Sequence, residues 1–532
     1  MKEIGKVASD YYHKEPSNLA FSFQTMKDYK PTTGDFIAIK HLNNLLIGQV
    51  VLSYAANRYL EDPRVLESSM YENAPPGLLE DDIGAWERGY VRIIGVWDGH
   101  NLDFSGVSPK PSDIVHLLSG DQLADLLGMG KTGLFIGTVG GKDSGLTIKL
   151  DPLETLAHNT LICGKIGSGK TYAGGVIIEE FLDAGYPVVA IDPHGELGLL
   201  NTPNDNEKDL EKLKEMGLEP KSYTTQFFAP KKFADEKEKI MPFGIEIGEL
   251  SEADIISIID PKNELGSKQL IVLMKAIDAL KKRRKNNFGI SELISQVNGV
   301  TDKKLEDSKT GLIYRLQGLY RYDIFSTVTD INSLVKPDSI SIITLPTVPL
   351  DIQAITVAVI ARKLLDARID GIIPKFLFYV EEAHKFVPSD GSVSSKSPLI
   401  TFAKECRKFG AGICISTQQP GDLADPIVSE THTKIFLQLD SQKDFSYLRS
   451  TVTDHWKPLI EMVPFFPIGR AILRAKTIRF PLIINIRPRK SKHGGTTGGV
   501  KFRRKKNDSS DYVDEVDLEK KLGKKSPNLL DY

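Results

Sequence analysis

The chain has 532 residues, of which 41% are hydrophobic and 26% are charged, and its formal net charge at pH 7 is −2. This length predicts more than one domain, and the composition excludes a chain that is disordered throughout. The near-neutral charge excludes a protein that coats nucleic acid with its whole surface, but it is compatible with a local basic channel.

The cysteine pattern and the hydropathy indicate in which cellular compartment the protein is located. The three cysteines form no C-x-x-C pair, which indicates neither a disulfide framework nor a structural zinc site. The N-terminal sequence lacks the apolar core of a signal peptide, and no apolar run is long enough to span a bilayer. The sequence therefore predicts a cytoplasmic protein with no membrane segment of its own.

Short β-type segments dominate the chain up to about residue 113. They are separated by turn signals, which predicts a small antiparallel β-barrel with strands at 19–23, 35–40, 45–53 and 90–97. The acidic stretch 72–87 is predicted to be an exposed loop. A short helix at 121–129 and a hairpin at 134–151, with a glycine-rich turn at 140–145, lead into the next part of the chain.

The stretch 160–184 combines an apolar segment, a glycine-rich loop and a helical pattern. The loop has the spacing G-x-x-x-x-G-K-T and consists of Gly164, Lys165, Ile166, Gly167, Ser168, Gly169, Lys170 and Thr171. Its glycines let backbone N–H groups turn toward a bound phosphate, and the following helix adds the positive end of its dipole. Lys170 would reach the β- and γ-phosphates, and the Thr171 hydroxyl would be a magnesium ligand.

A β/α pattern follows this loop. The apolar run 187–191 is typical of a buried parallel strand, and Asp192 directly after it is a site candidate, because ligands bind at the carboxyl ends of such strands. His194 is not favoured as a metal ligand, since no second histidine stands at metal-binding spacing. Residues 201–332 are predicted to be mainly helical. The basic run 281–285 is interpreted as a solvated helix end rather than a nucleic-acid contact.

The β/α pattern resumes with strands predicted at 339–345, 376–380, 412–417, 433–439, 470–473 and 482–486 and a helix at 352–369. From residue 487 the sequence is basic and rich in glycine. Such a composition cannot bury a core of its own, so any structure in this segment is predicted to come from a neighbour.

Polar residues follow two of these strands. Glu381 and Glu382 end the strand 376–380, where one carboxylate could hold magnesium and the other could deprotonate the attacking water. Gln418 ends the strand 412–417 and is suited to sensing the γ-phosphate. Arg407 precedes that strand, so it could serve an adjoining subunit's γ-phosphate, although an ordinary surface arginine fits the sequence equally well.

Together these motifs resemble the HerA family of DNA translocases, which is related to the bacterial chromosome-segregation DNA pumps. The resemblance covers nearly the whole chain and rests on residues 164–171, 192–196 (DPHGE), 381–384 (EEAH), 407–410 (RKFG) and 417–420 (TQQP). It implies an α/β fold, with a RecA-like P-loop NTPase core, an N-terminal small β-barrel, a helical insertion and an extended C-terminal tail. The implied divisions are 1–130 (barrel), 131–200 (first part of the core), 201–335 (insertion), 336–488 (second part of the core) and 489–532 (a brace that wraps a neighbouring subunit).

The resemblance also implies an activity and partners. It implies an ATP-driven double-stranded DNA translocase or helicase that forms a homohexamer, binds ATP and Mg²⁺ at its subunit interfaces, and works with a NurA-type nuclease in DNA end resection and recombinational repair. Glu382 would activate water, Gln418 would be the sensor, and Arg407 would act in trans. Asp192 matches a second acidic motif of the family. Glu381 stands where the family usually has aspartate, and its extra methylene moves the carboxylate outward.

Three other interpretations remain open on the sequence. The first is a HerA-like ATPase of an antiviral complex, and the second is an ATPase of the secretion or conjugation type. The third is a non-catalytic scaffold that binds nucleotide only to assemble. Lys396, in the loop after the acidic pair, is a candidate DNA contact, although simple solvent exposure also explains it.

Overall fold

The computed structural model describes residues 1–494 except for 9–15, 27–28, 58–84, 104–105, 131, 141–145, 237, 261–264, 285–286, 302–305, 326–327 and 452–455. Most of the predicted acidic loop 72–87 and of the predicted turn 140–145 therefore lies outside the described residues, as does the tail from residue 495. The last residues of the predicted acidic loop, 85–87, belong to a strand instead.

The N-terminal sheet closes into a barrel. Its antiparallel strands follow the order β2-β1-β7-β3-β4-β5, and β5 pairs with β2 to complete the ring. Phe23, Ile37, Val50 and Val91 fill its interior. The strands are β1 Lys2–Ala8, β2 Ala20–Thr25, β3 Phe36–His41, β4 Asn44–Asn57, β5 Ala85–Trp97 and β7 Ile114–Leu117, and the short β6 Leu102–Asp103 pairs with β5.

A second sheet forms the centre of the molecule, in the order β13-β12-β14-β11-β15-β16-β10-β17-β18-β19-β8-β9. It is parallel from β13 to β17 and antiparallel from β17 to β9. The strands are β8 Leu134–Val139, β9 Thr147–Leu150, β10 Thr160–Cys163, β11 Val188–Ile191, β12 Thr224–Pro230, β13 Ile240–Phe243, β14 Ser339–Ile343, β15 Leu377–Val380, β16 Gly412–Thr417, β17 Thr433–Phe436, β18 Arg470–Arg474 and β19 Leu482–Ile486.

Helices cover both faces of the central sheet. Alternate residues of β10 therefore point into different cores: Ile162 packs with Ile177 of α4, whereas Leu161 belongs to the core that contains Ile355 of α11. This two-sided burial explains why the parallel strands are continuously apolar. The helices are α2 Gly120–Leu127, α3 Pro152–Ala157, α4 Lys170–Asp183, α5 Glu207–Glu215, α10 Ile331–Leu334, α11 Leu350–Ile369, α12 Lys396–Glu405, α13 Asp425–Glu430, α14 Gln442–Ser450 and α15 Lys457–Ile460.

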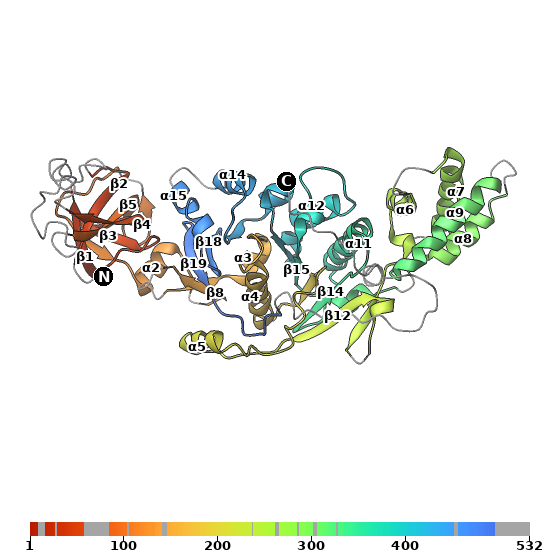
Figure 1. Ribbon diagram of the computed structural model, residues 1–532, viewed down its shortest axis with the longest axis horizontal. Coiled ribbons are helices and arrows are strands. Elements are labelled where there is room, and N and C mark those ends of the chain that lie inside the picture. Colours follow the sequence, from red (N-terminus) through yellow and green to blue (C-terminus); the bar gives the residue numbers. More distant parts are fainter. Residues whose placement is uncertain are drawn as a thin grey trace, which may run out of the picture.

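A helical insertion lies between β13 and β14, and consists of α6 Glu252–Ile259, α7 Ser267–Arg284, α8 Ile290–Asn298 and α9 Glu306–Gly318. Figure 1 shows the barrel and this insertion at opposite ends of the long axis, with the central sheet between them. The predicted α/β fold with an N-terminal barrel and a helical insertion is confirmed. None of the helices within the described ranges is both long and apolar enough to cross a membrane.

The prediction that residues 201–332 are mainly helical is wrong for one part. The strands β12 and β13 lie within this stretch and extend the parallel sheet beyond β14. They span seven and four residues, and an apolar run this short does not distinguish a buried strand from part of a helix. Pairing decides in favour of the strand, because residues 224–228 of β12 pair with β14 and residues 227–230 pair with β13, which satisfies the backbone groups of the run.

Candidate nucleotide-binding site

The phosphate-binding loop lies at the centre of the sheet. It joins β10, which is paired with β16 on one side and β17 on the other, to the first turn of α4. Gly167 and Gly169 have positive φ angles of 78° and 96°, a conformation that glycine adopts without strain. The loop and the amino end of α4 thus lie at the carboxyl edge of the parallel strands, where ligands bind in such sheets.

Lys170 lies between two carboxylates. Its ammonium donates to Glu381 and, over 3.1 Å, to Glu382, and it lies 3.3 Å from the hydroxyl of Ser416. Burial disfavours the charged ammonium, but the two carboxylates outweigh this effect and hold the pKa of Lys170 above its ordinary value. The lysine side chain is therefore a cation already aimed into the site.

Glu381 lies on the inner side of this pair. The Tyr379 hydroxyl donates to one of its oxygens, and the Ser416 hydroxyl donates to the other over 3.1 Å. Only 1% of Glu381 is exposed. A carboxylate that is so enclosed is held in one orientation by its neighbours.

Glu382 lies beside Gln418, which lines the cavity. Its Oε1 accepts from Gln418 over 2.7 Å, and its Oε2 lies 3.5 Å from Nδ1 of His384. Burial would raise the pKa of Glu382, but Lys170 and Gln418 favour the charged form and lower it. Glu382 is thus an ionised carboxylate, as a base needs to be.

The backbone of Glu382 is strained. It adopts φ 52° and ψ 43°, in the left-handed region that non-glycine residues seldom occupy. Such a conformation costs on the order of 1–3 kcal/mol and persists only where the surrounding structure enforces it. It turns the chain sharply after β15, so that Glu382 and Glu381 can both approach Lys170.

Thr171 is paired with a residue to which the sequence analysis assigned no role. Its hydroxyl donates to Glu196 over 2.5 Å and lies 3.5 Å from Glu381. Glu196 stands at the end of the DPHGE stretch, four residues after Asp192. One feature of the sequence could have indicated this contact: Glu196 follows shortly after the end of β11, at the same sheet edge as Thr171.

Asp192 shapes the turn that carries Glu196. Its two oxygens accept from the backbone N–H groups of Gly195 over 2.9 Å and of Leu197 over 2.8 Å. Complete burial raises the pKa of Asp192 to about 7, and the negative charge of Glu381 adds to this effect. These contacts hold the turn in place, and a role of Asp192 in the chemistry stays a prediction.

The oxygens around Thr171 fit a magnesium ion that arrives with a nucleotide. The Thr171 hydroxyl, Glu196 and Glu381 converge there. Among the described residues, no group of three or more histidine, cysteine, aspartate or glutamate side chains could hold a metal by itself. Magnesium in nucleotide sites needs few protein ligands, because phosphate oxygens and water complete its octahedron.

A cavity of about 760 Å³ opens beside the loop. Lys170, Thr171 and Gln418 line its inner part, and residues of α5, the segment before β18 and the chain after β19 line its outer part. Its volume is within the usual range for small-molecule sites. The residues of the outer part include Tyr172, Met216, Ile468, Pro488 and His493.

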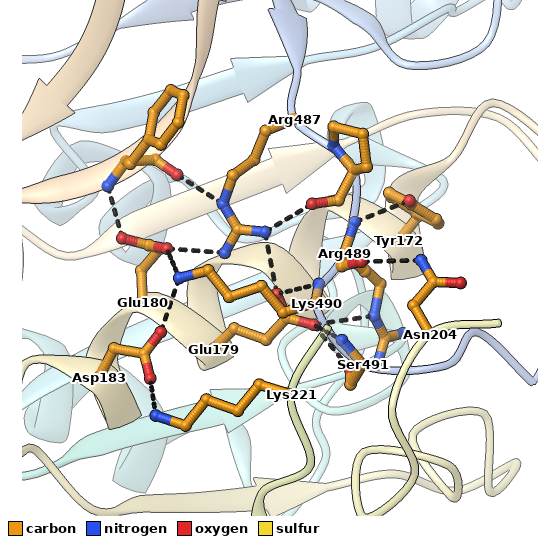
Figure 2. A network of polar contacts seen from close by, with 12 residues as sticks. Tyr172, Glu179, Glu180, Asp183, Asn204, Lys221, Arg487, Arg489, Lys490 and Ser491 are labelled. Carbon is orange, nitrogen blue, oxygen red and sulfur yellow. Dashed lines mark hydrogen bonds and ion pairs between the residues drawn. The ribbon is translucent and has the colours of Figure 1, made fainter. Parts of the chain in front are cut away.

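The chain directly after β19 is fastened to α4 by buried ion pairs. Arg487 contacts Glu179 over 3.0 Å and Glu180 over 2.7 Å, and the Ser491 hydroxyl donates to Glu179 over 2.6 Å. Figure 2 shows these contacts, together with Arg489 beside Glu179. We call residues 487–493 the strap. The prediction that this segment takes its structure from a neighbour is wrong for residues 487–494, because the chain's own helix α4 holds them.

Two glycines inside α4 make room for these contacts. A Cβ atom on Gly175 would lie 2.7 Å from Cζ of Arg489, and one on Gly174 would lie 2.2 Å from the Tyr379 hydroxyl. Glycine inside a helix costs about 1 kcal/mol relative to alanine, so such positions need a packing reason. Here the reason is the close approach of the strap on one side and of β15 on the other.

Comparison with known proteins points to one family. A family model described as the central domain of helicase HerA matches residues 134–364. The chain is 24% identical to the DNA double-strand break repair helicase HerA of Pyrococcus furiosus, over 89% of this chain and 90% of the relative. It is 23% identical to the protein of the same name from Sulfolobus acidocaldarius, over 86% and 89%. The chain is therefore similar to HerA proteins over most of its length, and residues 134–364 match their central domain.

Solved structures similar to this chain include VirB4 of Thermoanaerobacter pseudethanolicus, at 13% identity and a TM-score of 0.46 over 67% of this chain and 96% of that one. The plasmid coupling protein TrwB, in complex with a non-hydrolysable GTP analogue, aligns at 12% identity and a TM-score of 0.46 over 72% and 95%.

Arg407 and Lys396, which were also expected to have a function, lie outside the cavity lining. Arg407 is exposed in the turn Cys406–Phe409, which precedes β16, whereas Gln418 follows that strand. Arg407 therefore lies at the opposite edge of the sheet from the phosphate loop. Lys396 begins α12, and its ammonium donates to the carbonyl oxygens of Ser389 over 2.9 Å and Gly391 over 3.2 Å, so it braces its own loop.

Proposed function

We propose that this protein is an ATP-driven translocase or helicase that acts on double-stranded DNA. The observation that carries the proposal is the meeting of Lys170, Glu382 and Gln418 beside the phosphate loop. A phosphate loop alone binds nucleotide, whereas hydrolysis also needs a base positioned for water. The substrate class comes from the relatives that are named DNA double-strand break repair helicases.

In the proposed reaction a water molecule attacks the γ-phosphorus of ATP, and the bond to the bridging oxygen breaks to give ADP and phosphate. Glu382 takes the proton of the attacking water, while Gln418 holds the carboxylate in place. Lys170 exchanges its contacts with the two carboxylates for oxygens of the β- and γ-phosphates. Mg²⁺, when bound with the nucleotide, would supply positive charge to the phosphates, and Thr171 and Glu381 would hold it.

The assembly proposed is a homohexamer around DNA, with ATP at the subunit interfaces. The exposed position of Arg407 at the far edge of the sheet supports a role in the neighbouring subunit's site, since it cannot serve the phosphate loop of its own chain from there. We also propose the five-part division given above, a NurA-type nuclease on the barrel, and a role in DNA end resection inside the cell. Lys396 is the proposed DNA contact, and it would leave two loop carbonyls to make it.

The test is ATP turnover by the purified protein with and without linear duplex DNA, with the particle mass measured by light scattering in the same buffer. We expect turnover that rises with DNA in a hexamer-sized particle, and no turnover above background for Lys170→Ala. A monomer whose turnover ignores DNA would contradict the translocase proposal. Turnover by Lys170→Ala equal to wild type would contradict the assignment of the site itself.

A further inference from the structure

The outer part of the cavity combines aromatic and apolar side chains with the charged residues that α5 contributes. Tyr172 and His493 form one side, with ring centroids 5.4 Å apart at an angle of 69°. Ile468 also lines this part, and this residue is 77% exposed. An exposed aliphatic side chain beside two aromatic rings is a surface that a flat, largely apolar ligand group would remove from water.

Tyr172 is fixed in place from both sides. Its hydroxyl donates to Asp209 of α5 over 2.8 Å and accepts from the backbone N–H of Arg489 over 2.7 Å. Because Tyr172 follows Thr171 directly, its ring stands next to the phosphate-binding end of the cavity. A ring held in one orientation there is preorganised for a ligand that extends outward from the phosphates.

His493 is placed by the strap. Ser491, two residues earlier, is fully buried and donates its hydroxyl to Glu179, as Figure 2 shows. Desolvation and the positive charge of Arg489 lower the pKa of His493 to about 4. The imidazole is therefore neutral at pH 7, and it can lie against an uncharged ring without giving up the hydration of a cation.

We propose that the nucleoside of the bound ATP occupies this outer part, with its base against His493 and Tyr172. The inference rests on the proposed function, because it assumes that ATP binds at the phosphate loop. It adds to that function a residue of the strap that contacts the base, so the strap becomes part of the substrate site. Lys170 and His493 line the same cavity, so that one bound nucleotide could contact both.

The test compares two ligands by isothermal titration calorimetry in the presence of Mg²⁺. ADP carries a base, whereas inorganic tripolyphosphate probes the phosphate loop alone. For His493→Ala we expect the affinity for ADP to fall about tenfold, as is usual when an aromatic partner of a base is removed, with the affinity for tripolyphosphate unchanged. His493→Phe keeps a ring and should retain ADP affinity. His100→Ala, an exposed histidine after β5, is the matched control.

Each outcome separates the inference from the proposed function. If wild type binds both ligands and His493→Ala binds ADP as wild type does, the base site is wrong and the phosphate site stands. If His493→Ala weakens both ligands equally, His493 acts through the phosphate loop and the inference is overturned. If wild type binds neither ligand, the proposed function fails, and the base site fails with it.

Discussion

The Gln418 side-chain amide donates a hydrogen bond of 2.7 Å to the Glu382 carboxylate. The same oxygen also accepts from Lys170 over 3.1 Å. Gln418 can therefore keep Glu382 oriented when Lys170 turns toward the phosphates of a nucleotide. In this arrangement the amide is the one donor to that oxygen that need not move during the reaction.

The first prediction concerns this amide. Gln418→Ala should lower ATP turnover by about tenfold to a hundredfold, because the base loses its orientation, while the affinity for ATP changes little. Turnover at saturating ATP and the dissociation constant for ATP should be measured on the same preparation. Gln419→Ala, at the exposed next position, is the control and should behave as wild type. Equal turnover by the two variants would refute a role for Gln418.

The second prediction tests whether Arg407 acts in trans. Arg407→Ala should retain ATP binding but lose turnover by about a thousandfold, as expected for an arginine that stabilises transition-state charge. Lys408→Ala, which removes an exposed lysine paired with Glu405 over 2.7 Å, should retain turnover. Mixing Arg407→Ala with Lys170→Ala subunits should restore part of the activity, since some interfaces then have both intact residues. No recovery in mixed particles of normal size would contradict action in trans.

The third prediction follows from Asp192, whose pKa is raised by burial to about 7 from 3.8. Between these two values the folded chain holds a proton that the unfolded chain has lost, so stability falls as pH rises through this window and levels off above it. Asp192→Asn is less stable overall because its amide cannot accept from both backbone N–H groups. Its Tm should nevertheless fall less than that of wild type between pH 5 and pH 7.

Thermal unfolding at constant ionic strength measures this difference. The variant Asp278→Asn, at an exposed position of α7, should follow the pH dependence of wild type. Parallel curves for wild type and Asp192→Asn would show that Asp192 releases its proton equally easily in the folded and unfolded chains.

The fourth prediction concerns the buried ion pairs of the strap. Arg489→Ala removes one partner of Glu179, which is fully buried, and should cost about 3 kcal/mol of unfolding free energy. Lys492 lies in the same strap and forms an exposed ion pair with Asp205. Lys492→Ala breaks this pair and should lower the unfolding free energy by less than about 1 kcal/mol. The difference should appear as a much larger decrease in Tm for Arg489→Ala. Equal decreases would mean that the buried contacts do not stabilise the fold more than surface ones do.

The sequence predicted those parts of the molecule that local patterns encode. The phosphate loop and the strands around it were located correctly because glycine spacing and continuous apolar runs are read within a few neighbouring residues. Glu382 and Gln418 were expected at the same sheet edge because parallel strands align their carboxyl ends. Their contact with one another bears out that placement, whereas their catalytic roles stay predictions.

The missed features depend on contacts between distant residues. Arg487 and Glu179 are 308 positions apart in the sequence. Considered alone, each is a charged residue, and charged residues are usually exposed. The strand β12 becomes recognisable only when it pairs with β14. Gly174 and Gly175 were a local signal that could have been used, because a pair of glycines inside a buried helix requires something close beside it.

The ion pairs of the strap also affect the order in which the protein can fold. Helix α4 carries two buried carboxylates, Glu179 and Glu180, whose guanidinium partner Arg487 is synthesised about three hundred residues later. Until then the cationic partner Arg487 is missing, and Glu180 has only the backbone N–H of Phe135 among its earlier contacts, so the nascent helix is better left in water than packed on the sheet. The core around the phosphate loop can therefore complete its packing only at the end of synthesis, which delays a competent nucleotide site until nearly the whole chain has been made.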